Sequence, residues 1–492
     1  MRRCGILMPI FSLPSKYGIG SFSKEAYEFV DFLKAAGQSL WQILPLGPTG
    51  YGDSPYQSFS TFAGNPYFID VDEFVKEGFV TEADCKKYAC KDTSYVDYED
   101  MYKKRFKLLR KAYENSNVKA LKAYKTFVKD NEFWLDDYAL FMALKDEKGG
   151  IAWTEWEEDL KLRKAKALEN ARKRLASEID FYKFQQFYFN KQWKALKKYA
   201  NEAGVEIVGD IPIYVAFDSA DVWASPELFD LNEENIPNAV AGCPPDPFAP
   251  TGQLWGNPLY RWDVHRETGY AWWIKRIAYC FDLYDVVRID HFRGFDAFYT
   301  IPFTDKTAEN GKWRKGPGYD LFKAINNALG EKQIIAEDLG FLTDSVRRLV
   351  KRTGYPGMKI MQFAFGSGAD NEYLPHNLSS NSVIYTGTHD NETVRGWYER
   401  MLTDDKKCAE YVRFYAREED ASKMAWALIE LCYKSVCDTV IIPMQDFLNI
   451  GGEGRINTPA VLGGNWQWRM KKNACTKKLA KEIDKLRKLC LR

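Results

Sequence analysis

Eight short runs of apolar residues recur along the chain, and most of them are apolar throughout instead of alternating with polar residues. This pattern is typical of parallel strands that are covered on both faces. Helical patterns lie between most of the runs, such as 23–36 before Gly37 and 178–203 before Gly204. The runs are 4–8, 40–44, 205–208, 284–289, 333–336, 358–363, 382–385 and 439–442. Eight strand–helix units predict an α/β fold, a (β/α)8 TIM barrel.

The charge balance argues against nucleic acid and membrane surfaces as partners. The chain has 69 basic and 68 acidic residues, so its formal net charge of +1 creates no strong field. Basic runs at 161–164 and 172–174 are interspersed with acids and are predicted to be solvated helix faces. Aromatic residues make up 15% of the chain, and although most should pack in the core, rings in a cleft can also stack on sugars.

The cysteines and the apolar runs predict a cytoplasmic protein with reduced thiols. Ten cysteines occur without a Cys-x-x-Cys pair or a zinc-ligand spacing. The N-terminal apolar run ends at Pro9 and is too short for a secretion signal. No later run approaches the length of a transmembrane helix.

The segment 285–294 carries an unusual cluster of charges at the end of an apolar run. A buried strand has no structural use for Arg288, Asp290 and His291, because an unpaired buried charge is costly. At the C-terminal end of a barrel strand, however, such a cluster lies where active sites are built. We interpret Asp290 as a catalytic carboxylate and Arg288, on the same face two residues earlier, as its charge partner. The alternative is a structural Arg–Asp pair that caps the strand.

Three further predicted strands end in acids: Asp210 follows the third, Glu337 the fifth and Asp390 the seventh. Four carboxylates at one rim are hard to explain by stability, because like charges held close destabilise a fold. Cleavage of a glycosidic bond does need such a set, with one acid attacking the anomeric carbon and another protonating the leaving oxygen. A third acid can anchor sugar hydroxyls. No Gly-x-Ser-x-Gly elbow, phosphate-binding loop or His-x-x-x-His zinc spacing competes with this interpretation.

Two long connections interrupt the predicted barrel, which we take as a single catalytic domain of residues 1–492. About 160 residues separate the second and third strands, far more than such a connection requires. Within them, residues 72–174 are predicted to form a large, mainly helical inserted subdomain. The second connection, 211–282, is rich in Pro, Gly, Trp and Asp and is predicted to form active-site loops.

Four motifs follow the predicted strands: Gly209-Asp210-Ile-Pro212, Arg288-Ile-Asp290-His291, Glu337-Asp338-Leu-Gly340 and Thr388-His389-Asp390-Asn391. Four further segments stand out at 50–58, 244–258, 455–459 and 464–469. The motifs resemble signatures of the α-amylase clan, and the segments resemble signatures specific to amylomaltases. Over essentially its whole length the chain therefore resembles the 4-α-glucanotransferases, also called amylomaltases or disproportionating enzymes, of glycoside hydrolase family 77 in that clan. One departure is Ala460, where family members commonly have glycine.

The resemblance implies a role for each of the three acids. Asp290 would be the nucleophile that forms a covalent glucosyl-enzyme, kept ionised by Arg288. Glu337 would be the general acid and then the base, which requires it to be protonated at rest. Asp390, assisted by His389, would hold ring hydroxyls in a distorted geometry. Two displacements retain the α configuration, and we expect the carboxyl groups of Asp290 and Glu337 to lie roughly 5–5.5 Å apart.

The resemblance also suggests which residues bind the substrate. Candidates for sugar-ring contacts are Tyr56, Phe248 and Trp255. Gln253 and Asn257 could bind hydroxyls or brace their own loop, and Asp210 could bind sugar or orient Arg288. The full substrate-binding prediction comprises Tyr56, Asp210, Gln253, Trp255, Asn257, Arg288, His291, His389 and Asn391.

The implied activity is transfer of α-1,4-glucan segments from a maltooligosaccharide donor to the 4-hydroxyl of glucose or a glucan. No metal or other cofactor, nucleic acid or membrane partner is expected, and the protein would be a monomer or a homodimer. A retaining α-glucan hydrolase would use the same acids but admit water. An inactive glucan-binding protein is a further alternative, but it should have lost at least one of Asp290, Glu337 and Asp390, and all three are present.

Overall fold

Eight parallel strands form a closed barrel in the computed structural model, which describes residues 2–50, 52–90, 94–245, 249–340 and 342–492. The strands are β1 (Arg3–Leu7), β2 (Leu40–Gln42), β3 (Glu206–Ile211), β6 (Val286–Ile289), β9 (Ile334–Ala336), β10 (Gly357–Ile360), β11 (Ser382–Tyr385) and β12 (Thr439–Pro443). They follow one another around the barrel in chain order, and β1 closes it by pairing with both β2 and β12. The predicted (β/α)8 barrel is confirmed.

The barrel interior is packed with apolar side chains, which is why the strand sequences are apolar throughout. Every strand contributes to one buried cluster, so the barrel is a core and not a pore. The cluster consists of Leu7, Leu40, Val208, Val286, Ile335, Met358, Ile360, Val383, Tyr385 and Ile441. The strand predicted over 358–363 ends earlier than expected, because Met361–Phe363 turns into a 3-10 helix.

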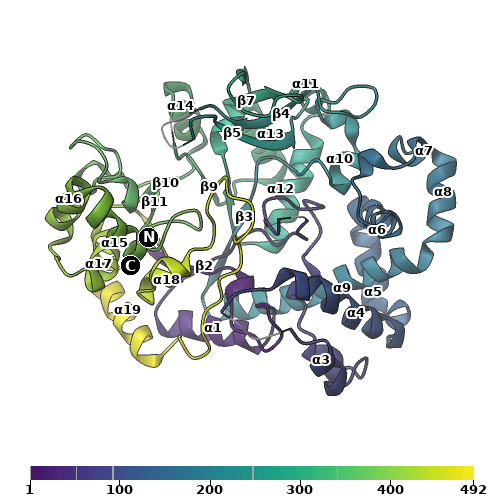
Figure 1. Ribbon diagram of the computed structural model, residues 1–492, viewed down its shortest axis with the longest axis horizontal. Helices are drawn as coiled ribbons and strands as arrows, with labels where there is room; N and C mark the ends of the chain where they lie inside the picture. Colours follow the sequence, from purple (N-terminus) through teal and green to yellow (C-terminus); the bar gives the residue numbers. More distant parts are fainter. Residues whose placement is uncertain (1, 51, 91–93, 246–248, 341) are drawn as a thin grey trace.

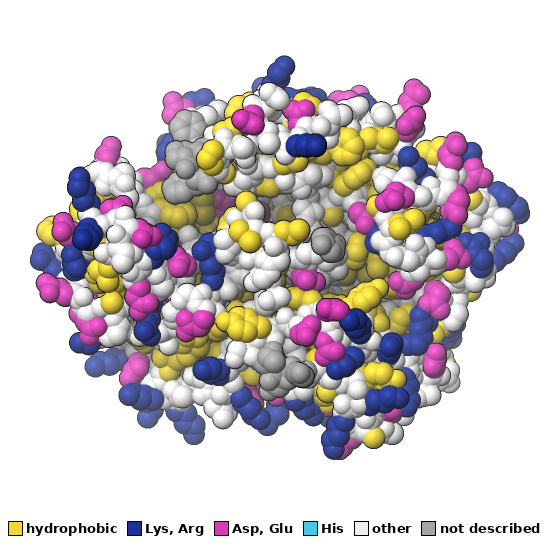
Figure 2. Space-filling view, in the orientation of Figure 1, with side chains coloured by type: hydrophobic (Ala, Val, Ile, Leu, Met, Phe, Trp, Pro, Cys, Tyr) yellow, Lys and Arg dark blue, Asp and Glu magenta, His cyan; other side chains and the backbone are white. Residues whose placement is uncertain are grey.

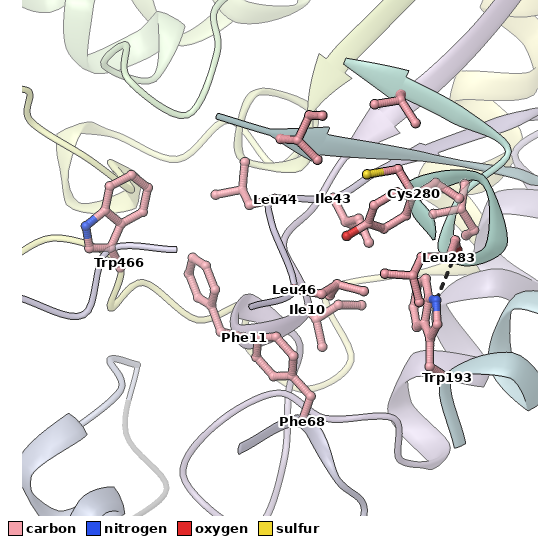
Figure 3. Close-up of a cluster of buried hydrophobic side chains, with 14 of the residues drawn as sticks. Ile10, Phe11, Ile43, Leu44, Leu46, Phe68, Trp193, Cys280, Leu283 and Trp466 are labelled. Carbon is pink, nitrogen blue, oxygen red and sulfur yellow. Dashed lines mark hydrogen bonds between the residues drawn. The ribbon is translucent and has the colours of Figure 1, made fainter. Parts of the chain in front are cut away.

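Helices surround the barrel and cover the outer faces of its strands (Figure 1). They include α1 (Lys24–Ala35), α9 (Ala176–Glu202), α12 (Ala271–Leu283), α13 (Tyr319–Leu329), α14 (Asp344–Thr353), α15 (Val394–Asp404), α16 (Lys406–Ala416), α17 (Met424–Lys434) and α19 (Lys477–Leu489). Between α9 and α12, Trp193 Nε1 donates to the Leu283 carbonyl at 3.0 Å (Figure 3). Between β10 and β11 the chain forms only short 3-10 helices.

The long connection between β2 and β3 is mainly helical and projects to the right of the barrel in Figure 1. Before α9 it contains α2 (Asp72–Lys76), α3 (Glu82–Lys87), α4 (Tyr98–Asn115), α5 (Lys122–Asp130), α6 (Glu132–Glu147), α7 (Glu158–Lys161) and α8 (Ala165–Arg174). Lys145 of α6 forms an ion pair of 2.5 Å with Asp218, in the loop after β3. The insertion therefore touches the segment that leads from a barrel strand, although the subdomain limits of 72–174 stay a prediction.

The second long connection is more regular than loops alone. It contains α10 (Ala220–Ala224), β4 (Ala239–Cys243), β5 (Gln253–Pro258), α11 (Trp262–Glu267) and the barrel helix α12. Strands β4 and β5 join β7 (Ala297–Pro302) and β8 (Lys312–Lys315) in an antiparallel sheet, ordered β5-β4-β7-β8. This sheet lies at the top of Figure 1. Two different barrel connections therefore build one accessory layer.

The surface carries charges of both signs. Figure 2 shows basic and acidic side chains intermixed over the face that it presents. In the part of the chain that the structure describes, no helix combines the length and the apolar character needed to cross a bilayer.

Gly209 of β3 offers a test of how tightly the barrel packs against its helices. A Cβ atom added there would lie 2.1 Å from Cγ of Tyr284, at the end of α12. We expect Gly209→Ala to lower the free energy of unfolding by about 1–3 kcal/mol, the usual cost of overpacking a core. Gly366→Ala is the matched control, because open space surrounds that glycine. Equal stability of the two variants in denaturant titration would contradict this packing.

Candidate active site

The C-terminal ends of three adjacent strands, β3, β6 and β9, bring the first predicted residues together. Pairing of β3 with β6 sets Asp210 opposite Arg288. Pairing of β6 with β9 sets Ile289 opposite Ala336, so Asp290 and Glu337 leave neighbouring strands at the same level. The hydrogen-bonding pattern of the sheet extends one residue beyond each strand. Asp290 N–H donates to the Ile211 carbonyl at 2.9 Å, and Glu337 N–H donates to the Ile289 carbonyl at 3.1 Å. Register alone therefore places both carboxylates at one rim.

Arg288 lies between two carboxylates at the mouth of the barrel. Its Nη1 donates to both oxygens of Asp210, at 2.8 and 2.7 Å, and its Nη2 donates to Oδ1 of Asp290 at 2.9 Å. Asp210 is fully buried, and its Oδ2 also accepts the Tyr56 hydroxyl at 2.8 Å. Of the two roles left open for Asp210, these contacts favour orienting Arg288 over direct contact with a sugar.

Glu337 is held by two backbone amides. Its Oε2 accepts from His291 N–H at 2.7 Å and its Oε1 from Leu339 N–H at 2.8 Å. Burial raises the pKa of Glu337 to about 7, and the Asp290 charge adds to this, whereas Arg288 and the two amides oppose it. The pKa of Asp290 is also raised by burial, with Arg288 as the main opposing influence. Contact with the Arg288 guanidinium therefore favours the ionised form of Asp290, whereas burial favours the protonated form of Glu337.

Asp390 extends from the loop after β11 and keeps 43% of its side chain exposed. Its Oδ1 accepts from Asn457 Nδ2 at 2.6 Å and lies 3.3 Å from His389 Nε2. Arg455 donates to the Asp390 carbonyl at 3.0 Å. Asn457 and Arg455 belong to a segment that the sequence singled out, but their contact with Asp390 was not predicted. The carboxylate is thus fixed from outside its own loop and remains accessible to solvent.

Three aromatic rings pack together beside Asp390. The Tyr56 and His389 rings stack with centroids 5.2 Å apart and planes 16° apart. Trp466 packs against both rings, at 5.8 Å from Tyr56 and 5.9 Å from His389. The sequence did not single out Trp466, although it lies within a recognised segment. The segment between α18 (Met444–Phe447) and α19, which contains Trp466, crosses the barrel in Figure 1.

Strand β5 carries Trp255, which packs against the residue that follows Asp290. Its ring meets the His291 ring edge to face, with centroids 4.8 Å apart, and its Nε1 donates to Gln253 Oε1 at 3.0 Å. Burial lowers the pKa of His291 to about 3, and the Arg293 charge adds to this, so the ring is neutral. Phe248 lies outside the described residues.

Two of the predicted substrate-binding side chains form hydrogen bonds with other groups of the protein. Asn257 is buried, donates to the Val215 carbonyl at 2.8 Å and accepts from Gln57 at 3.1 Å. Asn391 Oδ1 accepts from the Thr388 amide at 2.8 Å, which shapes the loop before Asp390. These contacts favour bracing roles for both amides. Among the residues that the structure describes, no group of three or more His, Cys, Asp or Glu side chains could hold a metal ion.

Comparison with known proteins gives consistent matches along the whole chain. A family model described as 4-alpha-glucanotransferase matches residues 8–476. A 4-alpha-glucanotransferase of Clostridium butyricum is 50% identical over 484 residues, which are 98% of this chain and 99% of the relative. One from Streptococcus pneumoniae is 48% identical, covering 96% and 94%. The solved amylomaltase from Streptococcus agalactiae in complex with acarbose has a TM-score of 0.96 and 42% identity, with 100% of both chains covered.

Removal of the guanidinium tests the charge arrangement at the barrel mouth. Arg288→Leu leaves the carboxylates of Asp210 and Asp290 without their shared cation, and breaking a buried pair in this way costs about 3–5 kcal/mol. We therefore expect a large loss of unfolding free energy at pH 7 that becomes smaller towards pH 4, where carboxylates take up protons. Arg314→Leu, which breaks an exposed pair with Asp230, is the control. A loss that does not depend on pH would contradict the ionic account.

Proposed function

This chain belongs to the 4-alpha-glucanotransferase family of enzymes, and we propose that Asp290, Glu337 and Asp390 carry out its reaction at the barrel mouth. The enzyme transfers segments of α-1,4-glucan from a donor to an acceptor. The observation that carries the proposed assignment is the contrast between the two carboxyl groups. Asp290 contacts a guanidinium at 2.9 Å, whereas burial raises the pKa of Glu337 to about 7. One group is suited to attack and the other to donate a proton.

In the first displacement, an oxygen of Asp290 attacks the anomeric carbon of the donor. The bond from that carbon to the leaving 4-oxygen breaks, and Glu337 transfers its proton to this oxygen. The leaving group departs as a free 4-hydroxyl and a covalent glucosyl-enzyme remains. The Arg288 guanidinium keeps the Asp290 carboxylate ionised before its attack. It stabilises the same carboxylate again when the bond from Asp290 to the anomeric carbon breaks.

In the second displacement, the acceptor 4-hydroxyl gives its proton to the Glu337 carboxylate and attacks the anomeric carbon. The bond to Asp290 breaks, so two inversions restore the α configuration. Asp390 would hold ring hydroxyls during both steps, because its carboxylate is fixed by Asn457 yet accessible to solvent. The carboxyl separation of roughly 5–5.5 Å between Asp290 and Glu337 stays a prediction.

Transfer requires that a sugar hydroxyl intercepts the intermediate before water does. The ring cluster of Tyr56, His389 and Trp466 beside Asp390 and the Trp255 ring beside His291 support acceptor binding and exclusion of solvent. The acarbose complex of the S. agalactiae amylomaltase supports a cleft for glucan-like ligands. We propose maltooligosaccharides as donors and glucose as an acceptor. We also propose a cytoplasmic monomer or homodimer, in keeping with cysteines that lack redox spacing.

The products formed from pure maltotriose test transfer through Asp290. We expect glucose together with maltopentaose and longer chains, because a maltosyl unit passes from one maltotriose to another. Asp290→Asn should lower the rate by at least about 1,000-fold, because no carboxylate remains to attack. Chromatography of the products measures both results. Glucose and maltose alone would identify a hydrolase, and a fully active variant would contradict the assignment of Asp290.

The pH dependence of kcat/KM tests the proton on Glu337. The free enzyme needs Glu337 protonated, and its pKa is raised to about 7, so kcat/KM should fall about tenfold per pH unit above that value. Initial rates between pH 5 and 9 give this limb of the profile. Glu337→Gln cannot donate a proton, so its residual kcat/KM should not show this fall above pH 7. A constant rate to pH 9 in the parent enzyme would contradict a role for Glu337 as the acid.

A further inference from the structure

The loop that carries His389 and Asp390 is held at both ends by one carboxylate, Asp446. This residue lies in the short helix α18, directly after β12. Its Oδ2 accepts the Thr386 hydroxyl at 2.5 Å, at the point where β11 ends. Its Oδ1 accepts from Val394 N–H at 2.8 Å, at the first residue of α15. The Asp446 side chain, which follows the last barrel strand, therefore bonds to both ends of segment 386–394.

Asp446 is an unusual residue for this position. It is 1% exposed, and Thr386 and Val394 are completely buried beside it. Among the described residues it forms no ion pair, and burial raises its pKa to about 6, although the Thr386 hydroxyl and the Val394 amide oppose this. A buried carboxylate without a cation is costly, and here only two hydrogen bonds and the N-terminus of α15 offset the cost. The two observed hydrogen bonds explain why a carboxylate is found here. Its two oxygens accept from two donors, the Thr386 hydroxyl and the Val394 amide, which lie at opposite ends of the loop.

The middle of the same segment is held separately. Asn457 N–H donates to the His389 carbonyl at 3.1 Å, and Gln362 Nε2 donates to the Glu392 carbonyl at 2.9 Å. Together with the bonds from Asp446 at its ends, these contacts hold the backbone on both sides of Asp390 against other barrel connections. A displacement at either end would shift the Asp390 carboxylate relative to the sugar.

We propose that Asp446 is a positioning residue that fixes both ends of segment 386–394 and so sets the place of Asp390 in the cleft. This inference rests on the proposed role of Asp390. Asp446 touches neither substrate nor reacting atoms, and it acts through hydrogen bonds instead of through its charge.

Two substitutions separate hydrogen bonding from charge. In Asp446→Asn the amide oxygen can accept from Val394 N–H, while the amide NH2 donates to the Thr386 hydroxyl, which can turn and accept. Both tethers remain, so kcat should stay within about threefold of the parent value. Asp446→Leu has a similar size but neither acceptor, and its kcat should fall about 100-fold, the loss expected when a group moves by about 1 Å. Equal losses in the two variants would overturn the inference.

A double-mutant cycle with Asp390→Asn tests whether Asp446 acts through Asp390. If it does, Asp446→Leu should lower kcat by less than about threefold in the Asp390→Asn background, because the group it positions is already gone. A general folding defect would instead multiply the two losses, and that result would overturn the inference. Full activity of Asp390→Asn alone would overturn the proposed role of Asp390. An inactive Asp390→Asn beside a fully active Asp446→Leu would overturn only the inference about Asp446.

Further variants cover the case in which Asp446→Leu does not fold. Thr386→Val removes only the tether at β11 and should lower kcat about tenfold, whereas Thr386→Ser retains the hydroxyl and should restore it. Thr476→Ala is the stability control, because it removes the cap of α19, where the Thr476 hydroxyl accepts from Leu479 N–H at 3.1 Å. This variant should melt at a lower temperature with an unchanged kcat. Parental activity of Thr386→Val, measured on folded protein, would overturn the inference.

Discussion

The arrangement at the barrel mouth depends on Arg288, whose guanidinium joins the end of β3 to the residue that follows β6. It donates to Asp210 and Asp290, and all of these contacts require neighbouring strands in one register. A guanidinium that is only 3% exposed could not remain there without both carboxylates. The same cation separates the two catalytic candidates, since Asp290 contacts it directly while Glu337 is held by amides. The fold therefore gives different electrostatic surroundings to two acids that follow adjacent strands.

This division of roles has a cost in stability. Glu337 has its pKa raised from an ordinary 4.5 to about 7, so the folded protein binds that proton more tightly than the unfolded chain. The stabilisation from this proton is complete below about pH 4.5 and is lost as the pH rises through 7. A neutral side chain would avoid the loss but could not take up or release a proton. A raised pKa of this kind is more typical of a functional group than of a residue selected for stability.

Patterns along the chain predicted the barrel, which the structure confirms, because apolar runs mark its strands. The same patterns predicted that Asp290 and Glu337 lie at one rim, because parallel strands in register bring their C-terminal residues together. The catalytic roles of these acids stay a prediction. The accessory sheet was missed because β5 contains Gly256, Asn257 and Pro258, residue types that are depleted in strands, and because the pairing of β4 with β5 is irregular between Val240 and Gly242. The contact of Asn457 with Asp390 joins residues 67 positions apart, and no local pattern encodes it. Asp210 shows the same limit, since its motif was recognised but only its contacts in the folded protein favoured one of its two roles.

Closure of the barrel has a consequence for how the protein is made on the ribosome. Strand β1 lies between β2 and β12, so one of its edges has no partner until the last strand has left the exit tunnel. Arg2, just before β1, likewise hydrogen-bonds to the Tyr433 carbonyl, 431 positions later. At synthesis rates of about 5–20 residues per second, that edge waits roughly 20–90 s. For this interval the nascent chain carries an apolar, unpaired strand edge, the kind of surface that chaperones recognise and that pairs wrongly with other chains.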